Sequence, residues 1–294
     1  MRYRVTGCCM LLSDFVGLYL LERETTPLYA AYLRASAEHF SAWLHHPATL
    51  DDFTDDRVNR YLIDRSDGRS RWTIKGERTR LLALWRAAWQ SELVSSPPRR
   101  VRKIGIPRVA PRAWTVAEMQ RLLKAASSVQ GEFFRTSAMI RLSRAKFWRA
   151  VVLVGYSTGL RLGDMERLKF NDVGHDGSLV VTQHKTGKVI VCHLLPEAIA
   201  AVKAIAKPPR PHIFGGVVGR RVYYRQFAAI VKAAGLDGST RWLRRTSGTL
   251  VEASHPGRGH EQTGNTRDVF LAHYCDPRLS RGRRVLPPRL ASRS

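Results

Sequence analysis

Cysteine, acidic residues and long apolar runs are all scarce in this sequence of 294 residues. The few cysteines match neither a zinc site nor a disulfide framework in spacing, so we expect a reducing compartment and no structural metal. They are Cys8, Cys9, Cys192 and Cys275. No segment approaches ~18 consecutive apolar residues, which argues against a transmembrane helix. The N-terminal stretch resembles a secretory signal only superficially, because Ser13 and Asp14 interrupt its apolar run.

The shortage of acidic residues leaves a large positive charge. Asp and Glu number 24 against 49 Lys and Arg, which gives a formal net charge of +25. A surplus of this size indicates an acidic polymer as the partner, and its spread along the whole chain favours nucleic acid over a membrane surface. We therefore expect no membrane contact and a cytoplasmic location, at the nucleoid if the partner is DNA. Charge alone does not distinguish DNA from RNA.

Residues 1–95 are predicted to form a helical domain. Helix starts are indicated by Thr26, which precedes Pro27 at a first helical position, and by Thr54. Apolar residues recur at steps of three and four after the first of these, and again in a helix near 74–93. These amphipathic patterns predict a bundle of four helices, one of the roughly two domains expected from the length.

Residues 96–112 are predicted to link that bundle to a second domain. The stretch 95–112 contains four prolines, six Lys or Arg residues and no acidic residue. Proline favours an extended path, and unbalanced charge repels itself, so we expect this segment to become ordered only on nucleic acid. An ordinary solvated linker is the alternative. The candidate DNA contacts in the segment are Arg99, Arg100, Arg102, Lys103 and Arg108.

Residues 113–294 are predicted to form a second domain of helices with one β-hairpin. Thr115 and Glu118 have the spacing of a capping box at a helix start. Two β-branched runs, 179–183 and 189–194, are joined by a short segment that contains glycine, which predicts a hairpin. The rest of the domain has helical periodicity. The predicted fold class is mainly α with a small β-hairpin or sheet (α+β).

One tyrosine stands where a helix is predicted to stop. Val269, Phe270 and Tyr274 lie at helical spacing, and Asp276 and Pro277 follow. The ring could simply complete a core face, with its hydroxyl hydrogen-bonded. The other interpretation is chemical: a phenol with a pKa near ~10 becomes a good nucleophile only when cations stabilise its anion or a base takes its proton. That hypothesis requires positive partners elsewhere in the chain.

Two arginine motifs supply such partners. Arg161 follows a predicted helix end at Gly159, near the start of the next helix, where N–H groups and a guanidinium suit a phosphate. The alternative for Arg161 is a plain ion pair with Asp164. The motif STRWLRRTSG then places a group of arginines at the head of a later helix: Arg241, Arg244 and Arg245. A guanidinium can bind two phosphate oxygens at once, which suits a phosphate site. The alternative is that this cluster on a basic protein is a solvated surface that faces DNA.

Four motifs occur in the order of a known family. They are TGLRLGDMERLKFNDV, HKTGKVIVCHL, RWLRRTSG and GNTRDVFLAHYCDPR. In this order they resemble the first arginine box, the lysine hairpin, the His-x-Leu-Arg box and the Gly-His box with nucleophilic tyrosine of the tyrosine recombinases, or phage integrases. The resemblance implies a helical core-binding domain followed by a tyrosine-recombinase catalytic domain. The implied activity is site-specific recombination of double-stranded DNA through a 3′-phosphotyrosyl intermediate.

Residue by residue, the resemblance makes Tyr274 the nucleophile and Arg161 and Arg244 the phosphate clamp. Lys185 is then the general acid for the leaving 5′ oxygen, with Lys188 on the same hairpin as the alternative; a solvated turn lysine is the plain interpretation of either. No metal or other cofactor is expected. The implied assembly is a homo-tetramer on two DNA sites, with room for a DNA-bending accessory protein. The C-terminal tail would reach a neighbouring subunit or DNA through Arg281, Arg283, Arg284 and Arg289.

Two positions depart from the family pattern. Arg241 stands at the usual histidine of the His-x-x-Arg box, and an arginine does not accept a proton at neutral pH. Asn265 stands at the histidine of the Gly-His box, where its amide can donate an uncharged hydrogen bond to phosphate. His260 is the alternative for that role. The proton acceptor for Tyr274 is left unassigned.

Three other functions stay open on the sequence alone. The two departures suit a catalytically weakened DNA-binding relative, and the same phosphotyrosyl chemistry would serve a type IB topoisomerase-like enzyme. An RNA-binding protein would also explain the charge, although the sequence has no aromatic stacking motif. Neither the target sites nor the role as integrase, resolvase or transposon enzyme of a mobile element is encoded in these motifs.

Overall fold

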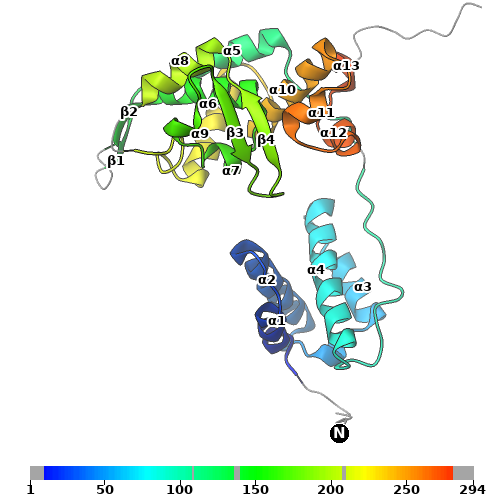
Figure 1. Ribbon diagram of the computed structural model, residues 1–294. Helices are drawn as coiled ribbons and strands as arrows, with labels where there is room; N and C mark the ends of the chain where they lie inside the picture. Colours follow the sequence, from blue (N-terminus) through cyan, green and yellow to red (C-terminus); the bar gives the residue numbers. More distant parts are fainter. Residues whose placement is uncertain (1–9, 108, 136–139, 207–209, 281–294) are drawn as a thin grey trace, which may run out of the picture. The chain divides into compact units, whose positions relative to one another are not determined.

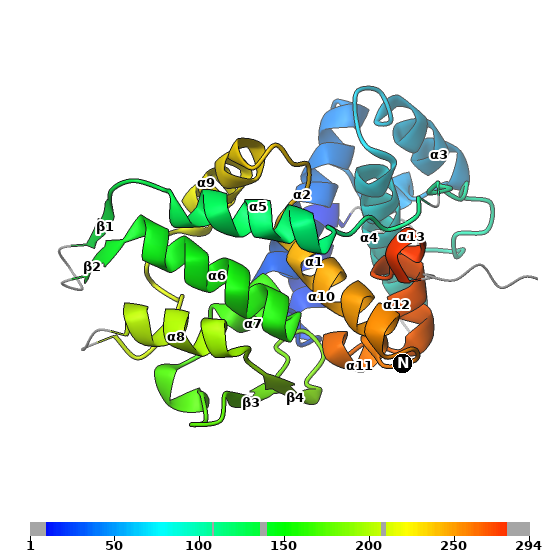
Figure 2. The same cartoon turned by 90° about the horizontal axis from the view of Figure 1, so that it is seen from above.

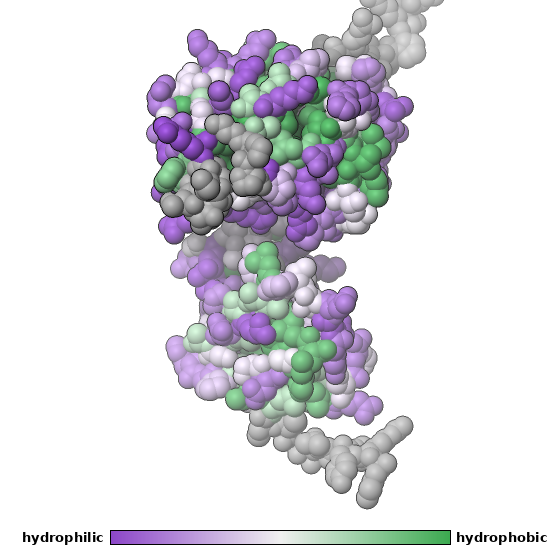
Figure 3. Space-filling model, turned by 60° about the vertical axis from the view of Figure 1, so that its left-hand side comes forward, coloured by the Kyte–Doolittle hydropathy of each residue, from purple (hydrophilic) through white to green (hydrophobic). Residues whose placement is uncertain are grey.

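The computed structural model, drawn in Figure 1, describes residues 10–107, 109–135, 140–206 and 210–280. The chain forms two compact units, Met1–Arg108 and Val109–Ser294, and each has its own apolar core. On the visible faces, hydrophilic side chains predominate and smaller hydrophobic areas lie between them (Figure 3). In the described part of the chain, no helix combines the length and apolarity that crossing a membrane requires.

Four α-helices make up the described part of the first unit, as the amphipathic patterns predict. They are α1 (Leu12–Leu21), α2 (Pro27–Leu44), α3 (Asp55–Asp64) and α4 (Arg71–Gln90), with a short 3-10 turn at Leu50–Asp52. The two predicted helix starts are confirmed, because the Thr26 and Thr54 hydroxyls each accept a hydrogen bond from a backbone N–H of the first turn. Such caps satisfy donors that a helix start leaves unpaired.

Aromatic rings fill the core of the first unit. Phe53 stacks on Trp85 with ring centroids 5.6 Å apart, and Phe40 meets Tyr61 edge-on at 5.2 Å. Stacked and edge-on pairs add to the free energy gained by burying apolar area. These contacts join α2, α3, α4 and the segment after the 3-10 turn into one body.

The basic segment after α4 lies against the first unit, and we call residues 96–107 the strap. The Asp55 carboxylate accepts the backbone N–H of Arg99 at 3.1 Å and that of the next residue at 3.0 Å. Asn59 accepts the N–H of Arg102 at 2.8 Å through its side-chain oxygen. Helix α3 therefore pairs with the strap backbone over several residues.

Two arginines of α4 complete this attachment. Arg78 donates to the carbonyl of Arg102 at 2.7 Å, and Arg71 donates to the carbonyl of Gly105 at 3.3 Å. The expectation that this segment becomes ordered only on nucleic acid is therefore not met. The physical reason is that side chains of α3 and α4 satisfy several of its backbone groups where no polyanion is present.

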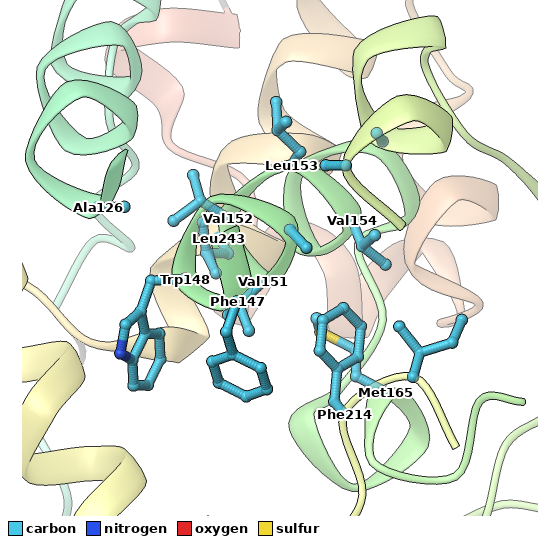
Figure 4. Packing of buried hydrophobic residues seen from close by; sticks show 14 of the residues in the cluster. Ala126, Phe147, Trp148, Val151, Val152, Leu153, Val154, Met165, Phe214 and Leu243 are labelled. Atoms are coloured by element: carbon cyan, nitrogen blue, oxygen red, sulfur yellow. The ribbon is translucent and has the colours of Figure 1, made fainter. Parts of the chain in front are cut away.

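The second unit is built around α6 (Arg144–Thr158), which is buried on nearly all sides. Its side chains Phe147, Val151 and Val154 pack among residues that include Met165 and Phe214 (Figure 4). A helix that is apolar all round must be covered by other elements. The other helices of the unit are α5 (Val116–Ser127), α7 (Leu162–Met165), α8 (Pro196–Ile205), α9 (Arg220–Ala233), α10 (Thr240–Ser254), α11 (Gly259–Thr263), α12 (Arg267–His273) and α13 (Pro277–Ser280), with a 3-10 turn at Phe170–Asp172.

Two antiparallel hairpins supply the β structure of the described residues. The predicted one consists of β3 (Ser178–Thr182) and β4 (Val189–His193). The sequence does not predict the other, β1 (Glu132–Arg135) with β2 (Ile140–Ser143), because its runs are short and interrupted by charged residues. This second hairpin lies at the end of the unit opposite to α11, α12 and α13 (Figures 1 and 2). The predicted fold class, mainly α with small β-hairpins, is confirmed.

Local signals set two helix ends in the second unit. The predicted capping box is present at the start of α5, where Thr115 and Glu118 exchange hydrogen bonds. At the other end of the core, α6 stops at Gly159, whose φ of 60° lies in the left-handed region that glycine favours. A Cβ at this position would also lie only 3.2 Å from the Ser247 hydroxyl.

A buried carboxylate, Glu77, holds three helices of the first unit together. The Tyr61 hydroxyl donates to it at 2.6 Å, Arg65 lies at 3.2 Å, and His39 at 3.4 Å. Burial by itself would raise the pKa of Glu77, but the hydrogen bonds from Tyr61 and Arg65 outweigh it and lower the pKa below its ordinary value. The carboxylate is therefore a charged anchor in an otherwise apolar core.

We expect Glu77→Ala to lower the free energy of unfolding of the first unit by about 3 kcal/mol, because Arg65 and the Tyr61 hydroxyl lose their buried acceptor. Hydrogen exchange of the backbone amides of α3 and α4 measures the change. Glu38→Ala, at an exposed position of α2, is the control and should shift the value by less than ~0.5 kcal/mol. Equal protection in Glu77→Ala and the wild-type protein would contradict the prediction.

Candidate active site around Tyr274

Tyr274 is the first residue after α12 and is half-buried. Its N–H donates to the carbonyl of Phe270 at 2.8 Å, and its own carbonyl accepts the Thr249 hydroxyl at 3.1 Å. The core position of this helix is occupied by Phe270, which is 1 % exposed. The tyrosine ring lies instead against Arg244, whose guanidinium carbon is 4.9 Å from the ring centroid. Its surroundings thus favour the chemical interpretation over a core ring.

Arg244, on α10, is a buried cation with 3 % of its surface exposed. One terminal nitrogen donates to the carbonyl of Gly159 at 2.6 Å, and the other donates to the carbonyl of Thr263. Its Nε is buried and has no hydrogen-bond partner within the described residues. Burial, with the nearby charge of Arg161, lowers the pKa of Arg244 to about 10, so the group is still charged at neutral pH.

Arg161 immediately precedes α7 and follows the left-handed turn at the end of α6. Its two terminal nitrogens donate to Oε1 of Gln183 at 2.8 Å and to Oδ1 of Asn265 at 3.3 Å. The ion pair with Asp164 is present but long, at 3.9 Å. The structure therefore brings together side chains from α7, the β3–β4 hairpin and the segment before α12.

These two guanidiniums change the ionisation of Tyr274. Burial would raise the pKa of the phenol, but the charges of Arg244 and then Arg161, with hydrogen bonds from both, outweigh burial and lower the pKa below its ordinary value. A lowered pKa increases the fraction of phenolate, the nucleophilic form. The positive partners required by the chemical interpretation are thus beside the tyrosine.

Gln183 is a site residue that the sequence does not reveal. Its side chain is fully buried and accepts from Arg161, while its amide nitrogen donates to the carbonyl of Thr263 at 3.3 Å. The backbone at Gly264 comes so close that a Cβ there would lie 2.6 Å from Nε2 of Gln183. No motif marks Gln183, and its position just before the hairpin turn is the one signal that could have drawn attention to it.

The two candidate lysines lie in the turn between β3 and β4. The Asp164 carboxylate accepts the backbone N–H of His184 at 2.9 Å, which ties the start of this turn to α7. Lys185 and Lys188 are both exposed. Within the described residues, neither ammonium makes a hydrogen bond or an ion pair. Asp164 thus fixes the backbone before Lys185. The side chains of both lysines are exposed to solvent.

Asn265 acts as a hydrogen-bond acceptor as well as a donor. Its oxygen receives the bond from Arg161, and its nitrogen donates to the Thr263 hydroxyl at 3.1 Å. The candidate substitute, His260 on α11, accepts the N–H of Asn265 through its backbone carbonyl at 3.1 Å. The Nδ1 of His260 is buried without a partner among the residues that the structure describes. Asn265, not His260, is the residue in contact with Arg161.

The other two arginines of the α10 motif occupy different positions. Arg241 is exposed and forms no side-chain hydrogen bond or ion pair with any described residue. Arg245 is half-buried and donates to the carbonyl of His273 at 3.1 Å; burial, then the charge of Arg241, lowers its pKa. In the described part of the chain, only Arg244 of this motif stacks on the ring of Tyr274.

The predicted DNA contacts of the strap are exposed side chains on a backbone that is held by α3 and α4. Those in the described part are Arg99, Arg100, Arg102 and Lys103. Arg108 lies outside the described residues. So does the C-terminal tail, with Arg281, Arg283, Arg284 and Arg289.

No protein-family model and no curated protein matches this sequence. Solved structures do match. A lambda integrase tetramer bound to a Holliday junction is 20 % identical, with a TM-score of 0.69 over 96 % of this chain and 81 % of that one. XerH site-specific recombinase bound to a palindromic difH substrate is 17 % identical, with a TM-score of 0.64 over 81 % and 73 % of the two chains.

The Tn1549 transposon integrase in complex with circular intermediate DNA is 15 % identical to this chain. Its TM-score is 0.63, and the match covers 90 % of this chain and 95 % of that one. All three proteins are tyrosine recombinases. The chain has the tyrosine-recombinase fold, and the fold predicted from the four motifs is confirmed.

We expect Arg161→Gln to raise the pKa of Tyr274, because the substitution removes one of the two cations that stabilise the phenolate. Carbon-13 labelling of the phenolic ring carbon follows the nine tyrosines separately during a pH titration, and Tyr274→Phe assigns the resonance. Arg121→Gln, an exposed position on α5, is the control and should leave that pKa unchanged. A Tyr274 resonance that titrates identically in Arg161→Gln and wild type would show that Arg161 has no influence on it.

Proposed function

We propose that this protein is a site-specific DNA recombinase in which Tyr274 breaks and rejoins DNA through a 3′-phosphotyrosyl intermediate. The observation that carries the proposal is a half-buried tyrosine beside two guanidiniums that lower its pKa. The tyrosine-recombinase fold supports the same class of reaction. A merely structural tyrosine would not need a buried cation against its ring.

In the proposed first step, the Tyr274 oxygen attacks a DNA phosphorus while the bond from phosphorus to the 5′ oxygen breaks. The phenol releases its proton to solvent, and the leaving 5′ oxygen takes one up from a general acid. Arg161 and Arg244 stabilise the extra negative charge of the transition state through the positive charges that they hold beside Tyr274. Attack by the 5′ hydroxyl of another strand then reverses the step and joins new partners.

We assign the general acid to Lys185. Asp164, which also pairs with Arg161, holds the N–H of His184 and so fixes the backbone immediately before this lysine. An exposed ammonium on a fixed turn can reach a substrate that lies over the site. Lys188 stands on the same turn and is the alternative.

Double-stranded DNA is the proposed substrate. Residues 1–95 would form the core-binding domain, residues 96–112 the basic linker and residues 113–294 the catalytic domain. The exposed cations of the strap support this division, because their backbone is already held in place for phosphate contact. A homo-tetramer on two DNA sites is the proposed assembly; lambda integrase, which shares the fold, was solved as a tetramer on a Holliday junction.

We expect Tyr274→Phe to bind duplex DNA and never to form a covalent link, because it lacks the attacking oxygen. Arg161→Ala should slow the link by about 100-fold or more with little loss of affinity, because it removes charge from the transition state while many other cations hold the duplex. Nicked suicide duplexes taken from the DNA that flanks the gene, resolved on denaturing gels, measure the link. Arg121→Ala is the control for loss of one exposed charge.

The outcomes of that experiment distinguish the recombinase from the alternative functions. DNA binding without a link in the wild-type protein would identify a catalytically weakened DNA-binding relative. A link at Tyr274 with relaxation of supercoils, but no exchange between two sites, would identify a topoisomerase-like enzyme. A link at a different tyrosine would overturn the assignment of Tyr274.

We expect Lys185→Ala to cleave ordinary DNA at least ~100-fold more slowly, because the 5′ oxygen then leaves without a proton. A substrate with sulfur in place of that bridging 5′ oxygen should be cleaved by Lys185→Ala at nearly the wild-type rate, because a thiolate leaves unaided. Lys188→Ala is the matched variant on the same turn. Rescue of Lys188→Ala rather than Lys185→Ala by sulfur would transfer the role to Lys188.

A further inference from the structure

A second buried carboxylate lies two residues after Tyr274. Asp276 has no exposed surface, and its two oxygens have different partners. Oδ1 accepts the backbone N–H of Arg278 at 3.0 Å and its Nε at 2.9 Å, which caps α13. Oδ2 accepts a second bond from the Arg278 side chain and the backbone N–H of Ala113 at 2.9 Å. The second oxygen therefore binds a residue that is distant in sequence.

Ala113 belongs to the segment by which the chain enters the second unit. The unit begins at Val109, directly after the basic strap and Arg108. The next residue, Trp114, is 1 % exposed and donates through its indole nitrogen to the carbonyl of Asp237 at 2.9 Å. This entry segment, residues 109–114, is thus anchored at its end by buried groups.

Helix α10 connects the entry segment with Tyr274. The Thr246 hydroxyl accepts the backbone N–H of Trp114 at 2.9 Å. One turn further on, the Thr249 hydroxyl donates to the carbonyl of Tyr274 at 3.1 Å and accepts the N–H of Asp276 at 3.0 Å. Both threonines are fully buried. The helix that places Arg244 against the tyrosine therefore also holds the entry segment.

A cap for α13 does not require this arrangement. Oδ1 of Asp276 alone accepts the backbone N–H of Arg278 at the start of that four-residue helix, and the arginine side chain that pairs with the buried carboxylate is itself 58 % exposed. Oδ2, which also accepts from the Arg278 side chain, accepts the bond from Ala113, and the cap does not need that bond. Buried, charge-assisted hydrogen bonds fix geometry more strongly than exposed ion pairs do.

We propose that Asp276 is a positioning residue that couples the entry segment to the nucleophile, so that engagement of the strap on DNA sets the position of Tyr274. The proposal rests on the function proposed above. Residues 109–114 connect the strap to the second unit, so seating of the strap on a duplex sets where this segment lies relative to the DNA. The hydrogen bond from Ala113 to Asp276 transmits that position to the backbone two residues from Tyr274. Cleavage is then coupled to correct seating of the first unit and the strap.

Asp276→Ala, which removes both side-chain oxygens and with them the bond to Ala113, tests the coupling in the full-length protein. We expect it to slow formation of the phosphotyrosyl link by roughly 10- to 100-fold, because a small displacement of a nucleophile has effects of this size. Affinity for the duplex should be unchanged. Arg278→Lys, which keeps a cation beside the buried carboxylate and leaves the bond to Ala113, is the matched control and should change the rate by less than about threefold. Equal loss of rate in both variants would overturn the proposal.

A double-mutant cycle separates coupling from a structural defect. Four residues, Gly-Ser-Gly-Ser, are inserted after Gly105 in the wild-type protein and in Asp276→Ala. We expect the insertion to slow the link in the wild-type protein by about tenfold and to have no further effect in Asp276→Ala, since the direct bond from Ala113 to the residue near Tyr274 is already absent. If the insertion and the Asp276 substitution slow the link by factors that multiply in the double variant, the strap and Asp276 act independently. That result would overturn the proposal.

Hydrogen exchange provides a readout that does not depend on cleavage. We expect Asp276→Ala to increase exchange of backbone amides both in residues 109–116 and in residues 267–276. Ala113→Pro removes the same bond from the other side and should increase exchange in residues 267–276. Increased exchange confined to one segment would exclude coupling, whether or not the wild-type protein cleaves DNA. Absence of a link in the wild-type protein would instead refute the proposed function, and the exchange data would still decide whether the two segments are coupled.

Discussion

The buried guanidinium of Arg244 is the interaction on which the arrangement of the second unit around Tyr274 depends. Taking a charge out of water costs several kcal/mol, and the cost is offset only if its donors find acceptors. Two backbone carbonyls fill this role, Gly159 at the end of α6 and Thr263 at the end of α11. Neither carbonyl is available unless its helix ends where it does. The positive charge that results lies against Tyr274, so the same contacts that fix the fold locally also prepare the phenol for ionisation.

The sequence predicts much of this because several features are local. The helix starts at Thr26 and Thr54, the capping box at Thr115 and the hairpin at residues 178–193 follow from neighbouring residues, and the structure has all of them. The four motifs in their order also predict the fold. What the sequence does not reveal is contacts between distant residues of ordinary type: Gln183 with Arg161, and Ala113 with Asp276. No periodicity or motif marks a glutamine as an acceptor for a particular arginine.

The departures from the family pattern also take on a physical meaning. Asn265 is expected from its sequence position to donate to phosphate, yet its oxygen accepts from Arg161 and its nitrogen donates to Thr263. An amide can do both at once, whereas a neutral imidazole has one donor and one acceptor in a fixed ring. The residue therefore aligns a cation in addition to any contact with substrate. Arg241, by contrast, is exposed on α10, and its charge helps to lower the pKa of Arg245, whose charge in turn interacts with Tyr274.

The attachment of the strap to α3 and α4 has a thermodynamic consequence. A segment that folds on binding loses conformational entropy in that step and buries additional surface, which gives a large negative change in heat capacity. Here Asp55, Asn59 and Arg78 already restrict the backbone from Arg99 to Arg102. Association with a duplex would then order little more than side chains and displace counterions from the phosphates. The heat-capacity change of binding would then be small, as for a rigid basic surface, and not the large negative change of a disordered arm that folds on binding.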